Sequence, residues 1–247
     1  MGLPTIAVPE YTLTIPSTEK TIKYRPFLVK EEKILLIALE SEDQTNILNA
    51  IKTIIDACIF GDTLKASEMP TFDLEYIFLQ LRAKSKGEVI ELKYECPKCK
   101  TELPVNINID DIQVTFQDKH TNKIELDTNL GVVMKYPTVD IQNDIIITGE
   151  DGEKTSQVEG IFTMVTKCID YIYDEQNTYP LKDHTEKEVD DFINSLTDAQ
   201  FQKLSGFFDT MPVLKHEFQV KCTKKKKDKT CSYKETQTLS GLQSFFV

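Results

Sequence analysis

The chain has 247 residues, 40% of them hydrophobic and 28% charged, as is usual for a protein that folds around its own core. This length is enough for one large domain or two modest ones. The formal net charge of −11 argues against a dedicated nucleic-acid surface, because such surfaces are basic. No apolar run reaches the roughly 18 residues that a membrane span needs, and the first residues lack the features of a signal peptide. We therefore expect the chain to fold in a reducing cytoplasm, where cysteines bind metals more often than they form disulfides.

The first third of the sequence predicts a hairpin followed by three helices. Alternating residues predict the hairpin, and apolar residues three and four positions apart predict the second and third helices. In the first helix the apolar residues from Ile34 to Leu39 nearly encircle the axis, so we expect it to be deeply buried. The hairpin is expected at 11–15 and 21–24, and the helices at 29–41, 44–60 and 72–84.

Four cysteines lie at the ends of strand-like runs in two distant parts of the chain. Cys96 and Cys99 form a Cys-x2-Cys turn between the alternating runs 88–95 and 101–109. Far downstream, Cys222 ends a second alternating run and Cys231 begins another. Such turns between strands are typical of a zinc ribbon, in which four thiolates bind one structural ion. The sequence therefore predicts one structural zinc site that joins residues 88–109 to residues 215–239.

Two other interpretations of these cysteines stay open: free thiols without a metal, and a redox or disulfide role. The gap between Cys222 and Cys231 is wider than the usual two to four residues. A redox Cys-x-x-Cys favours a strand-to-helix context, but the residues after Lys100 alternate like a strand. The lysine run 224–227 inside the wide gap predicts a solvated loop, with contact to phosphate or an acidic partner as the alternative.

The rest of the chain predicts strands, then a polar loop, then helices. Two capping boxes, Thr185 with Glu188 and Thr197 with Gln200, open two helices, and Pro212 ends the second. An apolar tail at 242–247 is expected to dock, either on this chain or on a partner. The strands are expected at 113–116, 123–126 and 130–136, a flexible loop at 140–157 and a further helix at 158–173.

Nothing in the sequence indicates catalysis. We find no phosphate-binding glycine loop, no His-Glu-x-x-His and no Gly-x-Ser-x-Gly. Cys58 and Cys168 lie in apolar helical patterns and are interpreted as buried core thiols. We therefore predict no catalytic and no cofactor-binding residues beyond the metal ligands.

These patterns predict an α+β fold in which helical N-terminal and C-terminal units are joined by a small antiparallel sheet with a zinc-ribbon-like four-cysteine site. The expected segments are an N-terminal hairpin or arm (1–24), a helical unit (25–87), a β-rich unit with the first cysteine pair (88–157), a second helical unit (158–214), and a last segment with the second cysteine pair, a strand and the apolar tail (215–247).

Several segments together resemble the T4-like phage baseplate hub assembly family. They are residues 24–36 with the block Arg-Pro-Phe-Leu-Val-Lys-Glu-Glu-Lys, residues 79–88, the turn Cys96-Pro-Lys-Cys99 and the closing Leu-Ser-Gly-Leu-Gln-Ser-Phe-Phe. The resemblance covers most of the chain in the same order. It implies a structural or assembly component of the hub of a contractile tail, without enzymatic activity.

We accordingly expect a non-enzymatic protein that binds other phage baseplate hub proteins and carries a structural metal site. It would lie in the host cytoplasm during assembly and would then either leave or stay in the tail baseplate of the virion. The alternative is a zinc-ribbon nucleic-acid-binding protein that uses Lys224 to Lys229.

Overall fold

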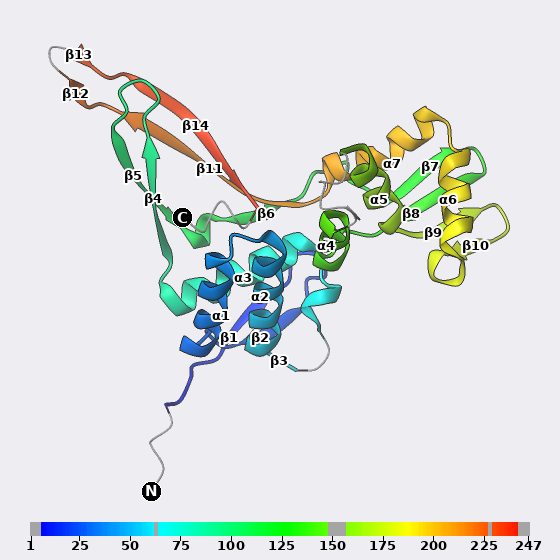
Figure 1. Cartoon of the computed structure of the whole chain (residues 1–247), viewed down its shortest axis with the longest axis horizontal. Helices are drawn as coiled ribbons and strands as arrows, with labels where there is room; N and C mark the ends of the chain where they lie inside the picture. The colour runs from blue at the N-terminus through cyan, green and yellow to red at the C-terminus, as the bar shows by residue number, and fades with distance from the viewer. Residues whose placement is uncertain (1–5, 62–63, 148–156, 227–228, 242–247) are drawn as a thin grey trace, which may run out of the picture. The chain divides into compact units, whose positions relative to one another are not determined.

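The structure is a computed structural model that describes residues 6–61, 64–147, 157–226 and 229–241. It contains two compact units. The first comprises residues 1–66, 72–115 and 213–247, and the second comprises residues 67–71 and 116–212. Mixed helices and small antiparallel sheets occur, with the four cysteines in one cluster, so the predicted α+β class is confirmed at this level (Figure 1). The five predicted segments stay a prediction.

The N-terminal part of the first unit is a layer of three helices beside a small sheet (Figure 1). The buried side chains of α2 and α3 recur at three- and four-residue spacing, and the largest of them are almost fully inaccessible, which confirms the predicted stripes. The strands, in the order β1-β2-β3, are β1 (Tyr11–Thr14), β2 (Thr21–Tyr24) and β3 (Ile59–Phe60), and the helices are α1 (Val29–Glu40), α2 (Gln44–Cys58) and α3 (Thr71–Lys86).

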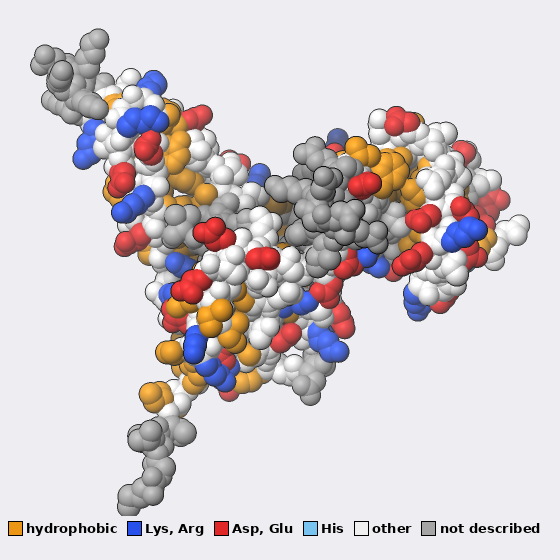
Figure 2. Space-filling view, in the orientation of Figure 1, with side chains coloured by type: hydrophobic (Ala, Val, Ile, Leu, Met, Phe, Trp, Pro, Cys, Tyr) orange, Lys and Arg blue, Asp and Glu red, His pale blue; other side chains and the backbone are white. Residues whose placement is uncertain are grey.

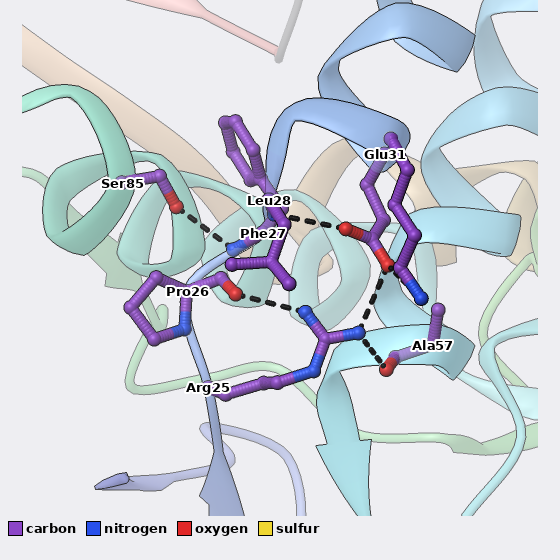
Figure 3. Close-up of polar contacts among 8 residues, drawn as sticks. Arg25, Pro26, Phe27, Leu28, Glu31, Ala57 and Ser85 are labelled. Carbon is purple, nitrogen blue, oxygen red and sulfur yellow. Dashed lines mark hydrogen bonds and ion pairs between the residues drawn. The ribbon is translucent and has the colours of Figure 1, made fainter. Parts of the chain in front are cut away.

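A buried ion pair ties these elements together at the start of α1 (Figure 3). The guanidinium of Arg25 donates to the carboxylate of Glu31 at 2.9 Å and to the carbonyl of Ala57, at the end of α2, at 2.8 Å. The other oxygen of Glu31 accepts from the amide of Leu28 at 2.8 Å, which satisfies a free donor at the helix N-terminus. The hydroxyl of Ser85, on α3, accepts from the amide of Phe27, just before α1, at 2.9 Å. The block that carries the family resemblance therefore fixes how α1 sits on its neighbours.

The expectation that α1 is deeply buried is wrong. Leu35 and Ala38 are buried, but Leu36 is 49% exposed and Ile37 is 57% exposed. The reason is that α1 packs on one side against α2, while its opposite side faces outward. Apolar residues around a helix show which of its sides can be buried, and the tertiary arrangement decides which of those sides are covered.

Two long hairpins form the remainder of the first unit and lie side by side (Figure 1). One hairpin pairs β4 (Val89–Glu95) with β5 (Glu102–Asn108). The other pairs β11 (Val213–Cys222) with β14 (Tyr233–Ser240), and β6 (Gln113–Thr115) adds to β11 in the sheet order β14-β11-β6. The predicted runs around both cysteine pairs are thus confirmed as strands.

The second unit is built on a four-stranded antiparallel sheet in the order β10-β9-β8-β7. A buried apolar cluster from β7, β8, β9, α5, α6 and α7 forms its core. The strands are β7 (Lys123–Asp127), β8 (Leu130–Met134), β9 (Ile169–Asp174) and β10 (Thr178–Pro180), and the helices are α4 (Val139–Ile147), α5 (Gln157–Lys167), α6 (Glu186–Ser195) and α7 (Asp198–Thr210). In the described parts of the two units, short 3-10 helices span Ala66–Glu68, Ile109–Asp111 and Leu181–Asp183.

Two predictions for this unit are wrong. The helix expected at 158–173 ends at Lys167, and β9 follows it and pairs with β8, because its isoleucines and tyrosines suit a strand and a partner strand is available. The loop expected at 140–157 contains α4, whose start is marked by Thr138 accepting from the amide of Ile141 at 3.4 Å. Residues 148–156 lie outside the described residues. The two capping boxes are confirmed at α6 and α7.

Within the described ranges, no helix combines the length and the apolar character that crossing a membrane requires. Cys58 and Cys168 are buried, as predicted, and burial raises their pKa values to about 11 and about 12. The apolar tail predicted to dock lies outside the described residues.

Candidate metal centre

The first cysteine pair lies in the tight turn between β4 and β5. The amide of Cys96 donates to the carbonyl of Thr101 at 2.9 Å, and the amide of Lys100 donates back to the carbonyl of Cys96 at 2.8 Å. Lys100 takes a positive φ of 57°, which closes the turn so that Cys96 and Cys99 stand on the same side of it. The strands on both sides are held in register from Val89 to Glu95, so the turn has a firm base.

The second pair comes from the far end of the β11–β14 hairpin. Cys222 is the last residue of β11 and lies opposite Tyr233, the first residue of β14. The residues between Cys222 and Cys231 contain a small hairpin of their own, β12 (Lys225–Lys226) paired with β13 (Lys229–Thr230). The amide of Cys231 donates to the carbonyl of Lys224 at 2.9 Å and closes this loop. The wide spacing is thus absorbed by an extra hairpin, which returns the chain to a point beside Cys222.

The four sulfur atoms of the cluster all lie within 4.8 Å of one another. The Sγ atoms of Cys96 and Cys231 are 3.8 Å apart, and those of Cys99 and Cys222 are 3.5 Å apart. A tetrahedral ion with metal–sulfur distances of about 2.3 Å places its sulfur ligands about 3.8 Å apart. The spacing therefore fits a single four-coordinate ion, and it is far longer than the roughly 2.05 Å of a disulfide bond.

The cluster is half enclosed by apolar side chains that link the two hairpins. Cys96 and Cys222 are buried, whereas Cys99 and Cys231 are partly exposed. Leu103, Val220 and Tyr233 are buried with them. This packing excludes water from one side of the sulfur atoms and contributes to the contact between the two hairpins.

The surroundings shift the pKa values of Cys99 and Cys222 in opposite directions. The hydroxyl of Thr101, 3.3 Å from the sulfur of Cys99, is the main cause that lowers the pKa of Cys99 to about 6. A backbone hydrogen bond at Lys224 lowers the pKa of Cys222, but burial and the neighbouring sulfurs outweigh it and raise the value to about 12. The contact with Thr101 therefore favours the thiolate form of Cys99, whereas Cys222 loses its proton more readily when a cation binds.

Sequence reasoning missed the tyrosines that support the cluster. The hydroxyls of Tyr94 and Tyr233 lie 3.0 Å apart and their ring centroids lie 6.4 Å apart in a stacked arrangement, so they bridge the two hairpins within the cluster that contains the cysteines. Alternation along the strands could have found them. Tyr94 stands two residues before Cys96 and Tyr233 two after Cys231, and residues two apart share one face of a strand.

The ligand atoms of the cluster come from cysteine alone. Among the described residues, no histidine or carboxylate joins the four cysteines. His120 packs against Tyr136 and Phe207 in the second unit, and His216 faces the carbonyl of Asp111. The donor set therefore consists of sulfur alone, which suits zinc and other thiophilic ions.

Comparison with known proteins points to one family. The sequence model of the family described as T4 bacteriophage base plate protein matches residues 8–247. The baseplate hub assembly protein gp26 of Enterobacteria phage T4 is 24% identical over 241 residues, which cover 96% of this chain and 98% of that protein. No solved structure matches the chain.

Proposed function

The chain belongs to the T4 bacteriophage base plate protein family, and we propose that it is a non-enzymatic structural or assembly component of the hub of a contractile tail baseplate. The observation that carries this proposal is the match along almost the whole of both chains to a baseplate hub assembly protein. A similarity that leaves no large segment unmatched supports a shared role for the whole chain. The comparisons give no support to the alternative of nucleic-acid binding through the lysines at 224–229.

An assembly role requires contacts with other baseplate proteins in the host cytoplasm, and a structural role requires such contacts in the tail baseplate as well. A net charge of −11 keeps the free protein soluble and favours partners with basic surfaces. Binding of this kind needs preformed surfaces on a rigid frame, which the three-helix layer and the paired hairpins supply.

We propose further that Cys96, Cys99, Cys222 and Cys231 bind one zinc ion with a structural role. The sulfur spacing, the sulfur-only donor set and the strand context of both turns support this assignment. A closed four-thiolate site leaves no position for a substrate or a water, so the ion would stabilise the fold and would not act in catalysis. It would join hairpins that are more than 100 residues apart in sequence. The redox alternative is disfavoured by the strand–turn–strand context.

The metal assignment is tested on the purified protein by elemental analysis and thiol titration. We expect one zinc per chain, lost in Cys222→Ser and kept in Cys58→Ala, a matched control whose thiol is buried outside the cluster. A protein purified under reducing conditions with four freely reactive cluster thiols and no metal, even after incubation with zinc, would refute it.

The functional proposal is tested in the phage. Infection with phage that lacks the gene should yield no complete baseplates, and the intact gene supplied in trans should restore them. A phage that builds normal tails without this protein would contradict the proposal. The Cys58→Ala and Cys222→Ser variants, supplied in the same way, report whether the cluster is needed for assembly.

A further inference from the structure

The outward face of α1 carries an apolar stripe. Val29 is 81% exposed, Leu36 49% and Ile37 57%, and these residues stand at positions i, i+7 and i+8 of one helix face. Lys33 and Glu40, both exposed, continue the same stripe at i+4 and i+11. Single exposed apolar residues are ordinary, but three of them on one face of a helix, together with two charged residues on the same face, indicate a contact surface.

The stripe is preformed on a firmly held helix. The ion pair between Arg25 and Glu31 fixes the first turn of α1, and buried Leu35 and Ala38 fix its inner side. Figure 2 shows hydrophobic side chains gathered at the surface over α1. A helix that is apolar nearly all round is normally buried all round, so this face lacks a covering element within the described part of the chain.

The charges on the stripe indicate what covers it. Lys33 and Glu40 lie at equal distances on either side of the Leu36–Ile37 pair. Neither of them forms an ion pair with another described residue, unlike Lys30, which lies 3.4 Å from Glu31. A second copy of α1 laid antiparallel about this centre would place Lys33 opposite Glu40 of the other chain, twice, and Leu36 against Ile37. A parallel copy would oppose like charges.

We propose that two copies of this protein associate through their α1 helices, antiparallel and about a two-fold axis that passes beside Leu36 and Ile37. One self-complementary patch then serves both subunits, as closed two-fold symmetry requires. Helix faces of this kind pack with their side chains interdigitating at an interaxial distance of 8–10 Å. Because the contact involves few elements, the interface is small, and we expect a dissociation constant on the order of 10 µM.

The first test uses the apolar centre, with mass measured by analytical ultracentrifugation over a range of concentrations. The full chain should show a reversible monomer–dimer equilibrium, and Leu36→Asp should be monomeric throughout. Val158→Asp is the matched control, since Val158 is a 63% exposed aliphatic residue on α5, and it should dimerise like the unchanged protein. Circular dichroism establishes that both variants are folded. A chain that stays monomeric about a hundredfold above the expected dissociation constant overturns the proposal.

The second test uses the charges and reads the orientation directly. Lys33→Glu makes the stripe entirely acidic and Glu40→Lys makes it entirely basic, so each variant alone should dimerise about tenfold more weakly. An equal mixture of the two should form heterodimers, and the double variant K33E/E40K should recover the original affinity. High salt should reduce these differences. Single variants that dimerise as well as the unchanged protein, or a mixture that does not recover, overturn the antiparallel arrangement.

Discussion

The ion pair between Arg25 and Glu31 offers a sharp test of how α1 is held. Glu31→Gln keeps an oxygen that accepts from the amide of Leu28 but removes the charge that Arg25 faces. The side chains of Glu31 and Arg25 are only 3% and 14% exposed. Breaking a buried pair by removing one partner costs about 3–5 kcal/mol. Here Arg25 retains the carbonyl of Ala57 as an acceptor and reaches some solvent, so we expect a loss of about 2–3 kcal/mol.

The assay is urea unfolding followed by circular dichroism, with Glu32→Gln as the matched control. Glu32 is the next residue on α1 and forms an ion pair with Lys86 at 2.6 Å, but its side chain is 33% exposed. An exposed pair contributes at most about 1 kcal/mol, so the control should lose far less stability than Glu31→Gln. Equal losses in the two variants, or a loss below about 0.5 kcal/mol for Glu31→Gln, would refute the view that this buried pair anchors the helix.

Three further predictions follow from single contacts. Burial raises the pKa of Glu31, but the hydrogen bonds from Arg25 and the Leu28 amide outweigh it and hold the pKa below its usual value. The ionised Glu31 therefore makes its full contribution to the free energy of unfolding above the unfolded-state pKa of about 4.3. This contribution is lost as the pH falls through the lower pKa of the folded state, so the difference in stability between the unchanged protein and Glu31→Gln should disappear in acid. Gly131→Ala should cost about 1–3 kcal/mol, because the new Cβ would clash with the ring of Tyr173 on the paired strand. The cost should shrink in a Tyr173→Ala background, which unfolding of the double variant measures. Removal of the metal by a chelator in native buffer should expose four thiols to a disulfide reagent. Cys58 and Cys168 should react only on unfolding, since both are buried and their pKa values are raised. Rapid reaction of all six thiols would contradict this.

Much of the local structure could be predicted because its causes are local. The capping boxes at Thr185 and Thr197 open helices through hydrogen bonds within four residues, and both helices form. The strands on either side of Cys96 and Cys99 follow from alternation, and the two cysteine pairs were matched from their similar strand contexts. Features that depend on residue type and on short spacing can be predicted from the sequence alone.

Features that depend on which surfaces meet could not be predicted in this way. Residues 169–174 carry a pattern that suits a helix or a strand, and pairing with β8 decides for the strand. The wide gap after Cys222 weakened the metal prediction, and only the small β12–β13 hairpin shows how Cys231 returns to the cluster.

The sequence by itself determined that α1 is a helix and that the apolar residues from Ile34 to Leu39 nearly encircle it. Only the tertiary structure decided that α2 covers one side of it and leaves Leu36 and Ile37 exposed. The physical reason is that helix formation depends on hydrogen bonds and spacing within the segment, whereas burial depends on the surfaces that distant segments bring to it.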